Sequence, residues 1–98
     1  MSDPRSDAPI HRLRDEISDV DRTILDAINA RLALVAELKR YKEEQGIPFV
    51  DPDRERQLLG ELVAANTGPL SESGLREVFG ELLDLMKREV SRDDPAGG

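Results

Sequence analysis

The chain is 98 residues long, enough for one small domain, and carries a net charge of −7 at neutral pH. That charge argues against a nucleic acid as the main partner, because phosphate binding needs a basic face. The sequence has no cysteine and one histidine, so it predicts neither a disulfide nor a metal site, and we expect no cofactor. It has no charged-then-apolar leader and no uncharged apolar run long enough to span a membrane, so we predict a cytoplasmic protein without a membrane partner.

The first ten residues, MSDPRSDAPI, combine two prolines with small and charged side chains. This composition is typical of a disordered lead-in, so residues 1–10 are predicted to precede the folded domain. The domain itself is expected to cover residues 11–91. Because the chain has few aromatic residues, its core should be aliphatic, which suits packed helices better than a β-sandwich.

Apolar side chains recur in steps of three and four from Leu13 to about Gln45, which predicts one long helix with a single apolar stripe. Gly46, followed by Pro48, provides its stop signal. At 1.5 Å per residue the helix would be about 48 Å long, too long for so short a chain to cover by itself. We therefore predict an intertwined homodimer, in which a second copy covers the stripe. The stripe consists of Leu13, Ile17, Val20, Ile24, Ile28, Val35 and Leu38.

Two long cations, Arg31 and Lys42, fall within this stripe, and Arg14 lies at its flank. Cations are costly to bury unless an anion meets them, although a long side chain can also run along an apolar surface and place its charge in water. Arg31 and Lys42 are separated by about 16 Å along a helix, which leaves room between their tips for a ligand of one six-membered ring. The spacing predicts an anion-binding pocket and leaves the anion open.

A second helix is predicted to begin at Asp51, which suits the N-cap, with Pro52 at the first helical position and Glu55 reaching back to complete a capping box. Its apolar residues are Leu58, Leu59, Leu62 and Val63, and it ends near residues 66–69. By themselves, Arg54 and Glu55 would most simply form an ordinary charged first turn.

Ser71 is expected to cap a third helix, with Leu70 and Leu75 spaced as a hydrophobic staple. Residues 92–98 lack apolar anchors and are predicted to form a disordered tail. No strand is needed, so the fold class is all-α, with one long and two shorter helices. The apolar set of the third helix is Leu75, Val78, Phe79, Leu82, Leu83, Met86 and Val90.

The segments LRDEISDVD, NARL, LKRYK and FVDPDRERQLL, taken together and in this order, resemble the all-helical (AroQ-type) chorismate mutases. The resemblance runs without a gap from Leu13 to Leu62 and continues more loosely through NTGPL and the third helix. It implies a three-helix protomer that forms an interlocked dimer with two shared active sites. It also implies the rearrangement of chorismate to prephenate in aromatic amino-acid biosynthesis, without a metal or other cofactor.

The resemblance assigns three cations to the substrate. Arg14 corresponds to an arginine that reaches into the partner subunit's site, and Arg31 to an arginine of the same subunit that binds a carboxylate. Lys42 corresponds to a lysine that contacts the ether oxygen and a carboxylate. These residues would clamp the dianion in its reactive conformer and stabilise the charge that develops on the ether oxygen.

Three further positions are assigned around the start of the second helix. Asp51 and Glu55 match the positions that hold the ring hydroxyl, Asp51 largely through its backbone. Arg54 matches a further cation at the pocket wall. On this basis Lys42, Arg31, Arg14 and Glu55 are expected to be catalytic.

The third helix departs from the family pattern. Met86 stands where a small residue such as serine is common, and Val90 stands where a glutamine or glutamate usually donates to the ether oxygen. Both are carried over as substrate-binding positions, but neither side chain can supply that donor.

Several alternatives remain open. An isochorismate pyruvate-lyase or an aminodeoxychorismate mutase would use nearly the same clamp on the same fold. A mutase of low intrinsic activity would need a partner enzyme of the shikimate pathway. A non-catalytic helical module would instead use the basic stripe to bind an acidic partner.

Overall fold

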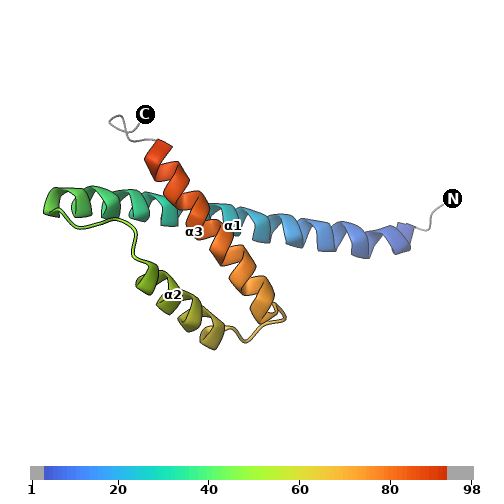
Figure 1. Cartoon of the computed structure of the whole chain (residues 1–98). Coiled ribbons are helices and arrows are strands. Elements are labelled where there is room, and N and C mark those ends of the chain that lie inside the picture. The colour runs from blue at the N-terminus through green and yellow to red at the C-terminus, as the bar shows by residue number, and fades with distance from the viewer. Residues whose placement is uncertain (1–3, 93–98) are drawn as a thin grey trace. The chain divides into compact units, whose positions relative to one another are not determined.

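The computed structural model describes residues 4–92, which form three helices and contain no strand within that range (Figure 1). Helix α1 runs over Pro4–Gln45, α2 over Pro52–Ala65 and α3 over Glu72–Arg92. The predicted all-α class with a long N-terminal helix is confirmed. No helix among the described residues is both long and apolar enough to cross a membrane.

Helix α1 begins at Pro4, upstream of the predicted start at Leu13, so residues 4–10 are helical rather than the expected lead-in. Proline is well tolerated at the first position of a helix, where its missing N–H would have no partner. Pro9 lies inside the helix, where it removes one backbone bond and crowds the carbonyl four residues earlier. Residues 1–3 and 93–98 lie outside the described residues. That residues 11–91 form the folded domain stays a prediction.

The end of α1 has the expected glycine signal. Gly46 has a φ of 69°, a left-handed conformation that glycine adopts without steric cost. The Gly46 N–H donates to the Glu43 carbonyl (3.2 Å) and the Ile47 N–H to the Lys42 carbonyl (2.8 Å). These two bonds are the pair that closes a Schellman motif, so the chain leaves the helix sharply after Gln45.

The chain divides into two compact units, Met1–Ala33 and Leu34–Gly98. The described part of the first unit is the N-terminal portion of α1. Its predicted apolar stripe is exposed, with 48% of Leu13, 59% of Ile17 and 57% of Val20 accessible. A row of large aliphatic side chains in water is unfavourable, so this helix face calls for a covering surface.

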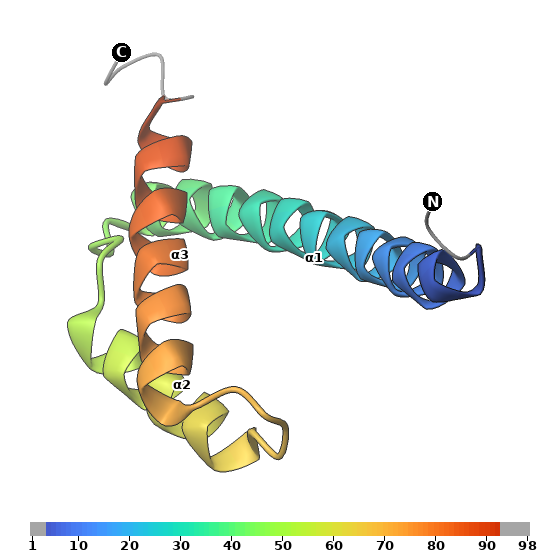
Figure 2. The same cartoon turned by 90° about the vertical axis from the view of Figure 1, so that its right-hand side faces the viewer.

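The second unit contains the end of α1 together with α2 and α3, and α2 packs against α3 (Figure 2). Within residues 34–92, the buried side chains come from one face of α3, and they are Leu75, Leu83, Met86 and Val90. Helix α2 contributes the half-buried side chains of Leu58, Leu59, Leu62 and Val63. The predicted aliphatic core is therefore present, and it is centred on α3.

Side chains cap both shorter helices. Asp51 is the N-cap of α2, and its Oδ1 accepts from the Arg54 N–H at 3.1 Å. Ser71 caps α3, its Oγ accepting from the Gly74 N–H at 3.0 Å. The predicted capping box with Glu55 is wrong, because Arg54 occupies the third helical position and the Glu55 carboxylate pairs with Lys87 instead.

We predict that Ser71→Ala lowers the free energy of unfolding by about 1 kcal/mol, because the first turn of α3 loses its side-chain acceptor. Chemical denaturation followed by circular dichroism measures the loss. Ser73→Ala is the matched control, since it removes a hydroxyl of the same turn that lies 3.4 Å from the Ser71 hydroxyl and leaves the cap itself in place. Equal stability of the two variants would contradict the capping role.

Candidate substrate site

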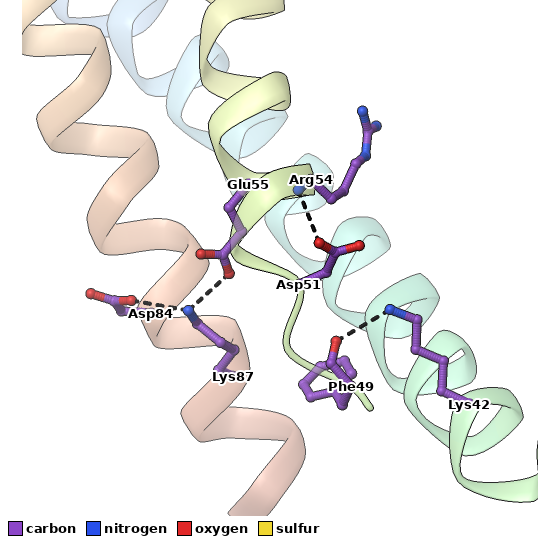
Figure 3. Close-up of polar contacts among 7 residues, drawn as sticks. All are labelled: Lys42, Phe49, Asp51, Arg54, Glu55, Asp84 and Lys87. Carbon is purple, nitrogen blue, oxygen red and sulfur yellow. Dashed lines mark hydrogen bonds and ion pairs between the residues drawn. The ribbon is translucent and has the colours of Figure 1, made fainter. Parts of the chain in front are cut away.

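Lys42 lies in the last turn of α1 and is half-buried. Its ammonium donates to the backbone carbonyl of Phe49 at 3.2 Å (Figure 3). This bond ties the end of α1 to the segment that leads into α2. An ammonium group has three donors, so a single carbonyl leaves capacity for a ligand. The structure thus places a cation with spare donors beside the start of α2.

The start of α2 brings Asp51 and Arg54 together. Because the Asp51 carboxylate caps the helix, its contact with Arg54 is to the backbone N–H and not to the guanidinium. The Arg54 side chain points away from Glu55 in Figure 3 and lies 3.6 Å from the carboxylate of Glu61. Arg54 and Glu61 are both more than half exposed, so their pair contributes little to stability.

Glu55 makes a contact that sequence analysis did not find. Its Oε1 accepts from the ammonium of Lys87 on α3 at 2.8 Å, and both side chains are about 30% exposed. Lys87 also lies 3.4 Å from Asp84 Oδ1, one turn earlier on α3. The hydrogen bond to Glu55 raises the pKa of Lys87 above its ordinary value of 10.5, with the two neighbouring negative charges acting in the same direction against partial burial.

The Asp84–Lys87 spacing of three residues could have been read from the sequence as a helical ion pair. The link to Glu55 could not, because it joins residues 32 positions apart on different helices. Local patterns carry no information about such a pair.

Met86 and Val90 are both buried, with 2% and 5% of their surfaces accessible. They pack on the inner face of α3, in the interior of the second unit. Their role as substrate-binding positions stays a prediction. What the structure adds is that these two positions are apolar and closely surrounded, whereas Lys87, next to Met86, carries the polar contact to α2.

Arg14 and Arg31 belong to the first unit, and the other six predicted site residues belong to the second. Arg14 is exposed and Arg31 is half-buried. The two arginines are separated by about 25 Å of rise along α1, since each residue of an α-helix advances 1.5 Å. Two side chains of one helix at that distance cannot hold the same ring-sized ligand.

The chain is therefore an all-helical protein with cations distributed along α1 and a polar cluster at the start of α2. The family model described as chorismate mutase type II matches residues 13–90. The chain belongs to this family, whose namesake activity is an isomerase reaction.

Solved structures of the family are closely similar. Chorismate mutase from Thermus thermophilus in form II has a TM-score of 0.83 and 36% identity, covering 88% of this chain and 98% of that one. The form I structure of the same protein has a TM-score of 0.78 and 37% identity, covering 80% and 98%. These values support the fold and the family together.

Two relatives known by function are also similar. The T-protein of Enterobacter agglomerans is 39% identical over 79 residues, which is 76% of this chain and 21% of the relative. A 4-amino-4-deoxychorismate mutase of Streptomyces venezuelae is 38% identical over 45 residues, covering 46% of this chain and 44% of the relative. The chain thus spans less than half the length of each of these relatives.

The raised pKa of Lys87 predicts how the Glu55–Lys87 pair responds to pH. A raised pKa in the folded state means that the pair stabilises the protein fully below the unfolded value of 10.5 and loses this effect as pH rises through the folded value. The wild-type protein should therefore have a higher melting temperature than the Lys87→Met variant at pH 7 to 9. This difference in melting temperature should shrink at pH above 10.5. Thermal melts of both proteins across this range provide the measurement. A difference that grows with alkaline pH would refute the pairing.

Proposed function

We propose that this chain catalyses the rearrangement of chorismate to prephenate as a homodimer with two shared active sites. The observation that carries the proposal is the family match over residues 13–90, combined with a family-type residue at Arg14, Arg31, Lys42, Asp51, Arg54 and Glu55. The reaction belongs to aromatic amino-acid biosynthesis, and the cytoplasm is the compartment we propose.

The reaction breaks a C–O bond while a C–C bond forms within one molecule, so it needs no nucleophile. Two protein contributions lower its barrier. One is to hold a flexible dianion in the conformer that reacts, and the other is to place fixed positive charge where the ether oxygen becomes negative. Arg14 and Arg31 would bind the two carboxylates, since a guanidinium can donate two parallel bonds to one carboxylate.

Lys42 would supply the charge at the breaking bond. Its ammonium is anchored on the Phe49 carbonyl, which fixes its direction while leaving donors for the ether oxygen. Glu55 would accept from the ring hydroxyl, and Asp51 would assist through its backbone because its carboxylate is occupied as the α2 cap. Arg54 would add positive charge at the rim, consistent with its exposure.

A dimer would supply a cover for the apolar stripe and a second arginine for each site. The stripe of the first unit is exposed along Leu13, Ile17, Val20 and Ile24, and the same stripe on a second copy is a covering surface of matching chemistry. The separation of Arg14 from Arg31 along α1 favours a site in which Arg14 comes from the partner. Met86 and Val90 would then form the apolar wall of the site on α3.

A second candidate is a 4-amino-4-deoxychorismate mutase, favoured by the identity to the Streptomyces venezuelae enzyme over 45 residues. The carbon skeleton and rearrangement would be the same, and the ring hydroxyl would be replaced by an amine. Loss of chorismate absorbance, with prephenate identified after conversion to phenylpyruvate in acid, tests the first candidate. The same assay on 4-amino-4-deoxychorismate tests the second candidate, and the assay on isochorismate tests an isochorismate pyruvate-lyase.

We predict that Lys42→Ala lowers turnover by about 10²- to 10³-fold, the usual cost of removing a group that stabilises a developing negative charge. The rate of chorismate loss is the measurement, with dimer content checked by sedimentation. Arg40→Ala removes the same charge from an exposed position two residues earlier on α1 and should retain activity. Near-normal turnover of the Lys42 variant would refute the assignment.

Shared sites also predict complementation between inactive variants. Arg14→Ala and Arg31→Ala homodimers should each be inactive, because every site has lost one clamp. On mixing, half of the dimers become heterodimers with one intact site each, so about a quarter of wild-type activity should return. Activity after subunit exchange measures this. No recovery, with heterodimers demonstrated by mass spectrometry, would contradict the cross-subunit role of Arg14.

A further inference from the structure

Lys87 is a charged residue of the second unit that the proposed reaction does not yet use, and it pairs with Glu55, which that reaction does use. The two side chains come from different helices and meet at 2.8 Å (Figure 3). Both are about 30% exposed, so solvent reaches them only in part. Most other ion pairs of the described residues join positions three or four apart on one helix and are more exposed. Lys87 therefore differs from most other paired cations in that its partner lies on another helix and its side chain is less exposed.

We propose that Lys87 is a positioning residue of the substrate site, and that its charge at Glu55 makes the site prefer a neutral ring hydroxyl over a ring ammonium group. The inference rests on the proposed function, because it takes Glu55 to face the ring substituent of the substrate. It goes further by naming the residue that sets the substrate class.

The contact with Lys87 orients the Glu55 carboxylate. A carboxylate has two oxygens, and Lys87 contacts one of them, Oε1. With that oxygen held, the side chain of Glu55 is fixed relative to α3, and its remaining acceptor capacity serves a substrate donor. A hydroxyl group donates one hydrogen bond and brings no charge, so it satisfies this acceptor without further compensation.

The charge of Lys87 would also act on a charged substituent of the substrate. An ammonium group bound to the same carboxylate would lie within roughly 6 to 8 Å of the Lys87 nitrogen, depending on which of the two oxygens it binds. Like charges at that distance repel, most strongly where water is partly excluded. A carboxylate without a lysine partner would instead attract the ammonium and favour the amino substrate. Lys87 therefore shifts the preference toward the hydroxyl.

Asp84 is a second carboxylate beside Lys87, at 3.4 Å from its nitrogen. Its side chain is 61% exposed, so solvent screens it more than Glu55. Asp84 partly offsets the lysine charge, and removing it should strengthen the discrimination against an amine. Removing the charge of Lys87 and removing the charge of Asp84 should therefore change the substrate preference in opposite directions.

A purely structural ion pair makes a different prediction. If Lys87 only joined α2 to α3, its loss would lower activity on both substrates by the same factor. The ratio of kcat/KM for chorismate to kcat/KM for 4-amino-4-deoxychorismate separates the two roles, because stability cancels in that ratio.

The experiment measures this ratio for wild type, Lys87→Met, Lys87→Arg and Asp84→Asn. Arg76→Gln is the matched control, since Arg76 is a cation of α3 that pairs with Glu72 at the surface. We expect wild type to prefer chorismate and Lys87→Met to lower the ratio at least about fivefold, the order of a partly exposed charge pair. Lys87→Arg should retain the ratio, Asp84→Asn should raise it, and Arg76→Gln should leave it unchanged.

The outcomes are distinguishable. An unchanged ratio in Lys87→Met, with chorismate still turned over, overturns the role of Lys87 and leaves the proposed function standing. Wild type that prefers the amino substrate also overturns it. Wild type without turnover of either substrate overturns both proposals. If Lys87→Met does not fold, Asp84→Asn decides, and an unchanged or lowered ratio there refutes the inference.

Discussion

The constraint on which the structure depends is the apolar face of α1 in the first unit. Leu13, Ile17, Val20 and Ile24 are each about half exposed, although they lie on one stripe of an amphipathic helix. Apolar area of this kind is worth roughly 25 cal/mol for each Å² removed from water, so a row of such side chains gives a strong drive to associate. The stripe also holds Arg31 and is flanked by Arg14. A surface that buries its aliphatic side chains would therefore also bring these two cations into the interface. Association and anion binding would then arise from the same helix face.

In the second unit, a small apolar core must hold several polar groups in defined positions. Its buried residues come from α3, and α2 contributes half-buried side chains. Local contacts fix the ends of the elements: the glycine turn at Gly46, the Asp51 cap and the Ser71 cap. These contacts determine where α2 starts, and so where Glu55 and the segment bearing Phe49 lie. The Lys42–Phe49 and Glu55–Lys87 bonds then join that segment to the end of α1 and to α3.

Much of this fold was predictable from the sequence because its signals are local. The steps of three and four in α1, the Asp51-Pro52 start and the Ser71 cap all act over a few residues, and each is confirmed. The start of α1 was not predictable in this way, because the prolines and small residues of its first turns indicate an irregular segment as readily as a helix terminus. The false capping box has a related cause. Glu55 lies one position beyond the residue that can reach back, and its partner is remote in sequence.

The predictions for the candidate site came from two sources. Spacing alone indicated an anion pocket from Arg31 and Lys42, and the roles of Arg14, Asp51, Arg54 and Glu55 came from resemblance. The contact between Lys87 and Glu55 was found by neither route, since Lys87 does not stand at a position that the resemblance assigns and the contact joins different helices. Pairing across helices depends on how α2 and α3 pack, which composition and periodicity do not specify.

The apolar side chains of Met86 and Val90 affect which group could stabilise the ether oxygen in the proposed reaction. These two positions of α3, where the resemblance implies a small residue and a hydrogen-bond donor, are here apolar, and apolar side chains cannot donate to an ether oxygen. The electrostatic work at that oxygen would then fall to Lys42, whose direction is fixed by Phe49. An apolar wall also lowers the local dielectric, which strengthens the interaction of a single ammonium with a developing negative charge. Loss of a donor and gain of an apolar wall therefore act in opposite directions on the barrier. The same wall would strengthen the repulsion between Lys87 and a substrate ammonium, so the features of α3 that depart from the family pattern would act together on substrate choice.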